Sequence, residues 1–392
     1  MADDARAVPE ITPQELARAL EAGEPLQVVD VRNPVRVAAG RIDLVPEGRF
    51  HNVLGSVLRA SASLEGTGIA PDLRTVVVCG HGNDSRVTVE HLRTLGLDAC
   101  SLRGGMAGYM NLVIGRPLTP PPSLDRLVQF DRIGKGGLTY LLVSDGEALV
   151  VDPPRDIAPL LEAARAAGAR ITGVADTHVH ADYISGATAL SRASGAPYWL
   201  HPADSSYAYD GTPGRLEFSP LEDGGTLRVG RCTLDVRHTP GHTEGSTSLL
   251  LGQTHAFTGD FVFVESLGRP DLGDRAGEWA QVLWRSIETA KRAWPADALV
   301  LPAHYSSERE RRPDRTIAAP FGELLRSNAA LAIAGRDAFL AWAGRPAAFP
   351  ESYRTIKAVN VGLRELTERE ADELELGRNE CAVSRPAGSP AA

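Results

Sequence analysis

Thr177-His-Val-His-Ala-Asp-Tyr183 is the most informative segment of this chain, and two shorter motifs follow it in order, Thr239-Pro-Gly-His242 and Thr258-Gly-Asp260. Each motif follows a strand-like run, so we expect each at a junction between a strand and a loop. His178 and His180 lie two positions apart, and an extended stretch would place both on one face. The three segments together predict a metal site.

The ligand types favour a particular metal. His178, His242 and Asp260 offer two imidazoles and one carboxylate, a set that suits Fe(II) with open coordination positions. Of the ten histidines, six fall between residues 178 and 255 and a seventh is residue 304, which places metal chemistry in the second half of the chain. A lone histidine is usually structural, and we interpret five in this way: His51, His91, His201, His238 and His255.

The same motifs, in this order, resemble those of the metallo-β-lactamase fold over roughly residues 124–305. The strand pairs of this region, with helices expected outside them, agree with the αββα architecture that the resemblance implies. Hydrolases of this fold, such as glyoxalase II, generally hold two metals and contain the sequence motif HxHxDH. Here the last position is Tyr183, so the second site loses an imidazole and keeps Asp182 and His304.

A further stretch, Gly268-Arg-Pro-Asp-Leu272, resembles the persulfide dioxygenases, which are mononuclear non-haem iron enzymes of this fold. They use O₂ to oxidise a thiol persulfide, typically glutathione persulfide, to sulfite. The resemblance implies one Fe(II) per chain, and we expect Arg269 to anchor an anionic part of the substrate, with a surface salt bridge as the alternative. The implied metal ligands are His178, His242 and Asp260, and the implied supporting groups, or a second-metal candidate set, are His180, Asp182 and His304.

The first half of the chain contains a reactive-thiol candidate. A buried strand is expected over Thr75–Cys79, and a helix over Arg86–Leu95. Cys79, at the end of this strand, lies beside the partial positive charge of the helix start, which stabilises a sulfur anion. The alternative is a buried structural cysteine. The loop after the thiol consists of Gly80, His81, Gly82, Asn83 and Asp84.

With Val28–Val35 and Leu102–Tyr109, this loop resembles a rhodanese (sulfurtransferase) domain over about the first 115 residues. The resemblance implies that Cys79 accepts sulfane sulfur as a persulfide. Asp84 stands where the family usually has Arg, and Tyr109 where a Trp often follows the GGM motif. The carboxylate argues against turnover of thiosulfate-like anions.

The 392 residues exceed the ~100–200 of one domain. We predict an α/β rhodanese-like domain with a parallel sheet and helices on both faces at 1–114, and a Pro-rich linker at 115–123. A metallo-β-lactamase-fold domain with a C-terminal helical extension follows at 124–382, and a disordered tail at 383–392. Within the extension we expect helices over Pro320–Ile333 and Asp337–Ala343.

Composition excludes several functions. The net charge is −9 without a Lys/Arg run, which argues against nucleic acid and anionic membranes as partners. No apolar stretch approaches the ~20 residues of a transmembrane helix. Four scattered cysteines without a CxxC pair predict reduced thiols and a cytoplasmic location, and we expect Cys381 to be inert. The sequence does not determine the oligomeric state, and a homo-oligomer is compatible with it.

The two sites together predict oxidation of a thiol persulfide, with O₂ and a sulfane-sulfur donor as co-reactants, coupled to sulfur handling at Cys79. The first alternative is a zinc-dependent thioester hydrolase of the glyoxalase II type with a degenerate rhodanese domain. The second is a non-catalytic sulfur-relay or regulatory protein.

Overall fold

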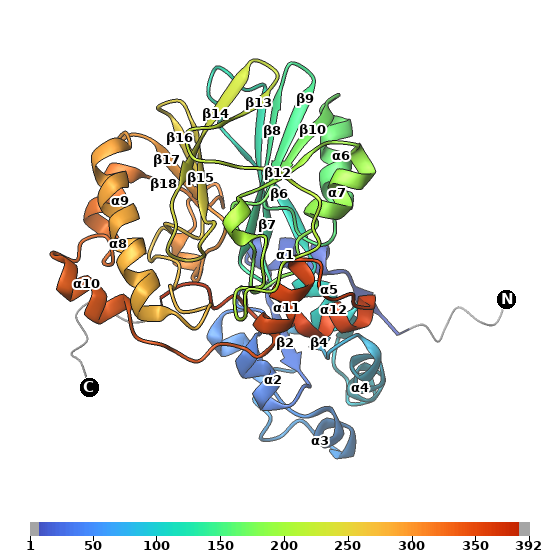
Figure 1. The fold of residues 1–392 in the computed structure, drawn as a ribbon. Helices are drawn as coiled ribbons and strands as arrows, with labels where there is room; N and C mark the ends of the chain where they lie inside the picture. The colour runs from blue at the N-terminus through green and yellow to red at the C-terminus, as the bar shows by residue number, and fades with distance from the viewer. Residues whose placement is uncertain (1–7, 384–392) are drawn as a thin grey trace. The chain divides into compact units, whose positions relative to one another are not determined.

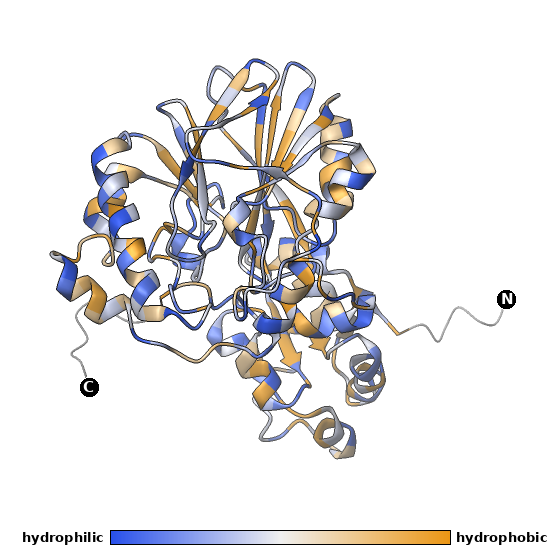
Figure 2. Ribbon diagram, in the orientation of Figure 1, coloured by the Kyte–Doolittle hydropathy of each residue, from blue (hydrophilic) through white to orange (hydrophobic). Residues whose placement is uncertain are grey.

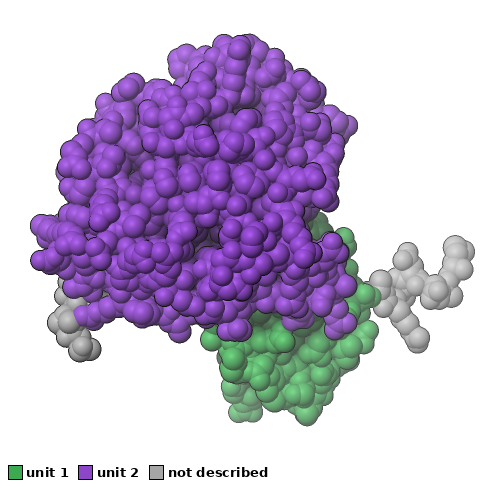
Figure 3. Space-filling view, viewed as in Figure 1, with its two compact units in different colours: residues 1–112, 132–135, 376–378 green, residues 113–131, 136–375, 379–392 purple. Residues whose placement is uncertain are grey.

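The computed structural model describes residues 8–383, and these fall into two compact units (Figure 3). Unit 1 comprises residues 1–112, 132–135 and 376–378. Unit 2 comprises residues 113–131, 136–375 and 379–392.

Unit 1 is built on a five-stranded sheet whose described strands all pair in parallel, in the order β1-β5-β4-β2-β3. The strands are β1 (Glu10–Ile11), β2 (Leu26–Asp30), β3 (Phe50–Asn52), β4 (Arg74–Val78) and β5 (Ala99–Leu102). The helices are α1 (Pro13–Glu21), α2 (Pro34–Ala39), α3 (Gly55–Ala60), α4 (Asn83–Thr94) and α5 (Gly105–Met110), with a 3₁₀ turn η1 (Glu47–Arg49). The predicted α/β class is confirmed.

Helix α4 begins three residues before the predicted Arg86. Gly82 is its N-cap, with φ 91° in the left-handed region, a conformation that glycine adopts without steric cost. The chain therefore passes from Cys79 into the helix within a very short loop.

Unit 2 contains two sheets. The seven-stranded sheet has the order β12-β11-β10-β9-β8-β7-β6, and the six-stranded sheet runs from β13 to β18 in sequence order. The first comprises β6 (Val113–Leu118), β7 (Arg126–Arg132), β8 (Gly137–Ser144), β9 (Glu147–Val151), β10 (Arg170–Ala175), β11 (Tyr198–Leu200) and β12 (Ser219–Pro220). The second comprises β13 (Thr226–Val229), β14 (Cys232–His238), β15 (Thr247–Leu251), β16 (His255–Gly259), β17 (Leu299–Pro302) and β18 (Ala319–Pro320).

The two sheets lie between two layers of helices (Figure 1). Helices α6 (Ala158–Ala166) and α7 (Ala187–Ser194) cover the first sheet, and α8 (Ala276–Ala293) and α9 (Phe321–Ser327) cover the second. Strand β8 is buried on both faces: Tyr140 and Leu142 join the core between the sheets, whereas Leu141 and Val143 face the helix layer. Figure 2 shows the resulting apolar strands. The predicted αββα class is confirmed.

The linker prediction was wrong for its first residues. Gly115–Leu118 lies in β6, and only residues 119–123 lack a helix or strand. Strand β6 is at the edge of its sheet, a position in which a proline such as Pro117 is tolerated.

The extension contains α10 (Arg336–Ala343), α11 (Ser352–Asn360) and α12 (Glu368–Leu374); the remaining 3₁₀ turns of unit 2 are η2 (Pro202–Asp204) and η3 (Glu308–Glu310). The helix predicted over Pro320–Ile333 is shorter than expected. It ends at Ser327 because the Asn328 side chain caps the backbone N–H groups of Ala330 and Leu331 in a turn. Of the predicted tail, residues 384–392 lie outside the described residues. Within residues 8–383, no helix has the length and apolar character that a membrane span requires.

Candidate metal centre and thiol loop

Three loops of unit 2 bring His178, His242 and Asp260 together. The loops follow β10, β14 and β16, and one ligand atom of each residue lies within 4.8 Å of the others. Asp260 Oδ2 is 3.6 Å from His178 Nε2 and 3.4 Å from His242 Nε2. Two ligand atoms bound to one metal at about 2.1 Å are separated by about 3.0–3.4 Å. The observed spacing fits a shared metal ion.

Hydrogen bonds on the far side of each ring orient the two histidines. His178 Nδ1 contacts Thr177 Oγ1 at 3.0 Å, and His242 Nδ1 donates to the carbonyl of Arg269 at 2.9 Å. Within the described residues, both Nε2 atoms and Asp260 Oδ2 are buried without a hydrogen-bond partner. Burial lowers the pKa of His242 to about 3, so its Nε2 carries a free lone pair. Three orphaned, converging donor atoms are what a metal requires.

The second oxygen of Asp260 joins the trio to His304. His304 Nδ1 lies 2.6 Å from Asp260 Oδ1, and His304 Nε2 lies 3.1 Å from Asp182 Oδ2. Burial alone would lower the pKa of His304, but Asp182 and Asp260 outweigh it and raise that pKa to about 10. Burial would raise the pKa of Asp260, yet the charges of His304 and His178 hold it well below its usual range. The two carboxylates therefore stabilise the protonated form of His304.

The ring of His180 packs beside that of His178, with 4.2 Å between centroids, but His180 belongs to a different group of possible ligand atoms. Its Nε2 is 3.2 Å from Asp152 Oδ1 in a separate buried group with Asp176. Asp152 also accepts from the backbone N–H of Thr177 at 2.7 Å, so it supports the loop that carries His178. The ring of Tyr183 stacks on His180 with 4.2 Å between centroids. The supporting role of His180 stays a prediction.

Asp204 is a positioning residue that sequence reasoning missed. Its Oδ2 accepts from the Val179 backbone at 2.9 Å and from Thr243 Oγ1 at 2.7 Å, and its Oδ1 accepts from the Gly245 backbone at 2.6 Å. It thereby ties the residue after His178 to the residue after His242. No motif marks Asp204, which lies in the short turn η2.

The Gly268–Leu272 stretch contacts the trio through its backbone. A Cβ atom at Gly268 would lie 1.9 Å from the Asp260 carbonyl oxygen and 3.0 Å from His242 Cγ, so only glycine fits. The guanidinium of Arg269 pairs with both oxygens of Asp271 at 2.6 and 2.7 Å. Its remaining N–H groups reach three backbone carbonyls, those of Ala347, Ala348 and Glu380. All five donors of Arg269 are thus engaged within the protein, and its substrate-anchoring role stays a prediction.

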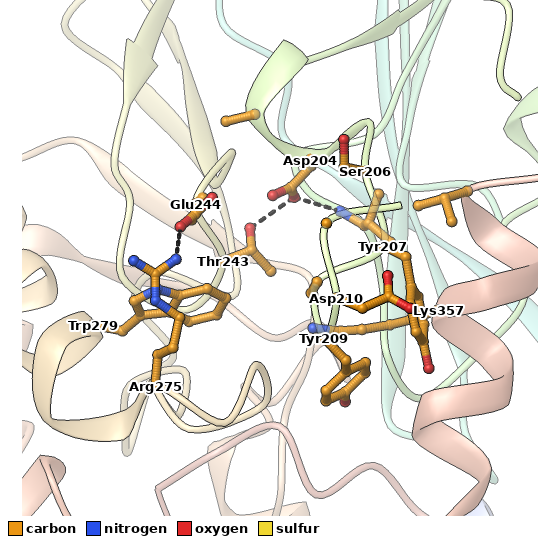
Figure 4. A pocket seen from close by; sticks show the side chains of 15 residues that line it. Asp204, Ser206, Tyr207, Tyr209, Asp210, Thr243, Glu244, Arg275, Trp279 and Lys357 are labelled. Atoms are coloured by element: carbon orange, nitrogen blue, oxygen red, sulfur yellow. Dashed lines mark hydrogen bonds and ion pairs between the residues drawn. The ribbon is translucent and has the colours of Figure 1, made fainter. Parts of the chain in front are cut away.

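A cavity of about 180 Å³ is lined in part by the residues that follow two of the candidate ligands (Figure 4). Val179 and Thr243, which follow His178 and His242, line it. Arg275 and Trp279 occupy one side of it and Tyr209 and Lys357 the other. Lys357 is buried and donates to the Leu272 carbonyl at 3.1 Å, and burial lowers its pKa to about 8.

The thiol loop of unit 1 curls around Cys79. The backbone N–H of Gly82 donates to the Cys79 sulfur at 3.1 Å, and Ser85 Oγ lies 3.3 Å from it. Gly105 at the start of α5 lies so close that a Cβ there would be 2.4 Å from the Cys79 carbonyl oxygen.

Asp84 does not turn toward this thiol. Its carboxylate pairs with Arg59 of α3 at 2.6 Å, and the pair lies at the surface, with the Asp84 side chain 48% exposed. Its negative charge is therefore compensated outside the loop.

Comparison with known proteins identifies similar sequences and folds. Residues 132–320 match the metallo-beta-lactamase superfamily and residues 12–112 the rhodanese-like domain. The mitochondrial persulfide dioxygenase ETHE1 of Homo sapiens is 32% identical over 181 residues, which cover 42% of this chain and 63% of that protein. A hydroxyacylglutathione hydrolase of Anaeromyxobacter dehalogenans is 38% identical over 139 residues, 35% of this chain and 50% of that protein. The crystal structure of a metallo-beta-lactamase from Staphylococcus aureus superposes with a TM-score of 0.51 at 25% identity, over 66% of this chain and 75% of that one. The match thus spans less than two thirds of each of the two curated relatives.

Proposed function

Because this chain belongs to the metallo-beta-lactamase superfamily and carries a rhodanese-like domain, we propose that it is an iron-dependent persulfide dioxygenase. Its substrate would be the persulfide of a low-molecular-weight thiol, glutathione persulfide or an analogue, and its product sulfite. The similarity to human persulfide dioxygenase supports this reaction class.

The observation that carries the proposal is the buried trio of two imidazoles and one carboxylate with unpartnered donor atoms. This set is the usual one for non-haem Fe(II) in enzymes that use O₂. Held by His178, His242 and Asp260, the metal would supply open positions at which the persulfide sulfur and O₂ meet. Tyr183 supports a mononuclear centre, since its ring stacks on His180 where dinuclear hydrolases offer another imidazole.

The residues around the trio would bind and orient the substrate. The cavity beside Val179 and Thr243 accommodates a small thiol, and Arg275 and Lys357 on opposite sides can attract its carboxylates. Asp204 keeps the two histidine loops together while the substrate enters. Trp279 and Tyr209 supply apolar surface that excludes water from part of the cavity.

Cys79 would act as a persulfide carrier. The N–H of Gly82 and the hydroxyl of Ser85 point at its sulfur and would stabilise a persulfide anion. In our proposal the carried sulfur passes to a small thiol, and the resulting persulfide becomes the substrate of the metal centre. The reverse order, in which sulfite collects sulfur from Cys79 to give thiosulfate, uses the same two sites.

Oxygen consumption tests the proposal. Anaerobically purified, iron-loaded protein should consume O₂ and form sulfite when glutathione persulfide, or another thiol persulfide, is added. His178→Ala should abolish uptake, whereas His255→Ala, a change of a buried histidine whose Nδ1 contacts Thr254, should retain it. Absence of uptake with every thiol persulfide would refute the dioxygenase.

The alternative is a zinc-dependent thioester hydrolase, favoured by the 38% identity to the hydroxyacylglutathione hydrolase. It would hydrolyse an acyl-glutathione without consuming O₂. Zinc would support this activity in place of iron. The same preparations, supplied with an acyl-glutathione, separate the two reactions. If Cys79 carries no persulfide by mass spectrometry after donor treatment, the rhodanese-like domain is a docking or sensing module instead.

A further inference from the structure

The segment that carries His178 and His180 has few backbone partners of its own. Residues 176–184 form neither helix nor strand, yet His180 and Tyr183 are only 0% and 3% exposed. Within residues 8–383, no backbone N–H donates to the carbonyl of either residue. A buried carbonyl without a donor costs free energy, so this part of the chain requires a side-chain donor from elsewhere.

Asn360, the last residue of helix α11, is that donor. Its Nδ2 donates to the carbonyl of His180 at 2.9 Å and to that of Tyr183 at 2.8 Å. Its Oδ1 accepts from the backbone N–H of Ser185 at 2.9 Å. Both N–H groups and the oxygen of one amide thus bind a single short stretch, residues 180–185, which we call the 180–185 turn.

Glu375, which follows helix α12, holds the same turn at Ile184. Its Oε1 accepts from the Ile184 backbone N–H at 2.7 Å, and its Oε2 accepts from Arg155 Nε at 3.2 Å. Glu375 is buried, and the guanidinium compensates its charge. The C-terminal extension therefore holds the end of the segment, whereas Asp152 and Asp204 hold its beginning.

The 180–185 turn is connected to the trio through Asp182. Asp182 Oδ2 lies 3.1 Å from His304 Nε2, and His304 Nδ1 lies 2.6 Å from Asp260 Oδ1. The other oxygen of Asp260 faces the two histidines of the trio. A displacement of the turn would move Asp182, would release His304 and would change the orientation of the Asp260 carboxylate. Groups that orient metal ligands in this way affect metal affinity strongly.

We propose that Asn360 is a positioning residue of the candidate metal centre. It holds the 180–185 turn where Asp182 meets His304, and it thereby fixes Asp260 in the trio. Asn360 acts only through backbone groups, and no motif of the sequence marks it. The inference rests on the metal centre of the proposed function but not on the reaction, because it concerns the binding of the metal alone.

Metal binding by Asn360→Asp tests the proposal. The substitution replaces the amide NH₂ group by an oxygen, which cannot donate and which would face two carbonyl oxygens. Asn52→Asp is the control for the same chemical change, because Asn52 Nδ2 donates to two carbonyls of unit 1, those of Asp30 and Arg32, at 2.8 and 2.9 Å.

Two readouts on the full chain separate positioning from general stability. Chelator competition under anaerobic conditions gives the Kd for Fe(II), and the visible d–d absorption of bound Co²⁺ reports on coordination geometry. In Asn360→Asp, the Kd should rise about 10–100-fold and the d–d bands should change in intensity. Asn52→Asp should have the wild-type Kd and spectrum. A wild-type Kd and spectrum in Asn360→Asp would overturn the proposal. Asn360→Ala, which adds no charge, is measured in the same way in case Asn360→Asp does not fold.

Hydrogen exchange of the wild-type protein gives a test without any substitution. Coupling between two sites is reciprocal, so Fe(II) should stabilise the hydrogen bonds that hold the 180–185 turn. Exchange of the Ile184 and Ser185 amides should therefore slow when Fe(II) is added to the metal-free protein. The Ala70 amide, which the Gln27 side chain holds in unit 1, should exchange at the same rate in both states. Equal exchange of the turn with and without Fe(II) contradicts the proposal. These measurements need no substrate, so failure of the oxidation and failure of the positioning role are distinguishable.

Discussion

Asp204 provides the most direct test of how the candidate metal centre is held together. Its two carboxylate oxygens accept three hydrogen bonds from the loops that carry His178 and His242. In Asp204→Asn one oxygen becomes an NH₂ group, which cannot accept. The substitution keeps size and shape, but it removes one acceptor oxygen and the negative charge of the carboxylate; the control described below removes a charge as well.

The expected free-energy cost of Asp204→Asn follows from the groups that donate hydrogen bonds to Asp204. Whichever way the amide is oriented, it faces a backbone N–H, either that of Val179 or that of Gly245. A buried N–H without an acceptor costs about 1–3 kcal/mol. The loops can relieve this cost by moving apart, which displaces one imidazole from the other. Loss of such an outer contact lowers metal affinity about 10–100-fold, which equals about 1.4–2.8 kcal/mol.

Competition with a chromophoric chelator under anaerobic conditions measures the Kd for Fe(II), and urea unfolding of the metal-free protein measures stability. Asp210→Asn is the matched control, because Asp210 lines the same cavity and caps the Thr212 N–H at 2.8 Å. We expect a higher Kd for Fe(II) in Asp204→Asn and an unchanged Kd in Asp210→Asn. Equal Kd values in both variants would refute the view that Asp204 positions the ligand loops.

Three further outcomes follow from the geometry. Gly268→Ala should lose metal and destabilise the fold by more than ~1 kcal/mol, because its Cβ would lie 1.9 Å from the Asp260 carbonyl oxygen. Metal analysis and thermal unfolding measure both effects, and Gly277→Ala is the control, because a Cβ at Gly277 meets nothing within 4 Å. Cys79→Ser should leave O₂ uptake with preformed persulfide intact but abolish uptake driven by a sulfane donor plus thiol, and loss of both would contradict a carrier role. Burial lowers the pKa of Lys357 to about 8, so its positive charge is lost as pH rises through that value. The KM for an anionic thiol persulfide should therefore rise above that pH in the wild type but not in Lys357→Arg, and identical KM profiles would exclude Lys357 from binding.

Much of the fold could be predicted locally. Thr12-Pro13-Gln14-Glu15 is by itself a helix-start signal, and both reciprocal hydrogen bonds of the capping box are present at the start of α1. The apolar runs at β8 and β9 are typical of buried strands, and in the structure both strands are buried. The edge strand β6 was missed, since a proline-rich stretch is compatible with a strand only at an edge, and edge position is a property of the whole sheet.

For the site, the sequence by itself was enough to single out His178, His242 and Asp260. Each ends a strand-to-loop motif, and side chains at such junctions converge when the strands lie in neighbouring sheets. It could not place Cys381 beside Asp182, or Asp204 between the two histidine loops, because these contacts join segments far apart in the chain without a local pattern. The engagement of Arg269 by Asp271 and three carbonyls likewise depends on where the C-terminal segment packs. Short-range periodicity and motif spacing encode the elements and the first ligands, whereas the packing of distant segments determines which groups support them.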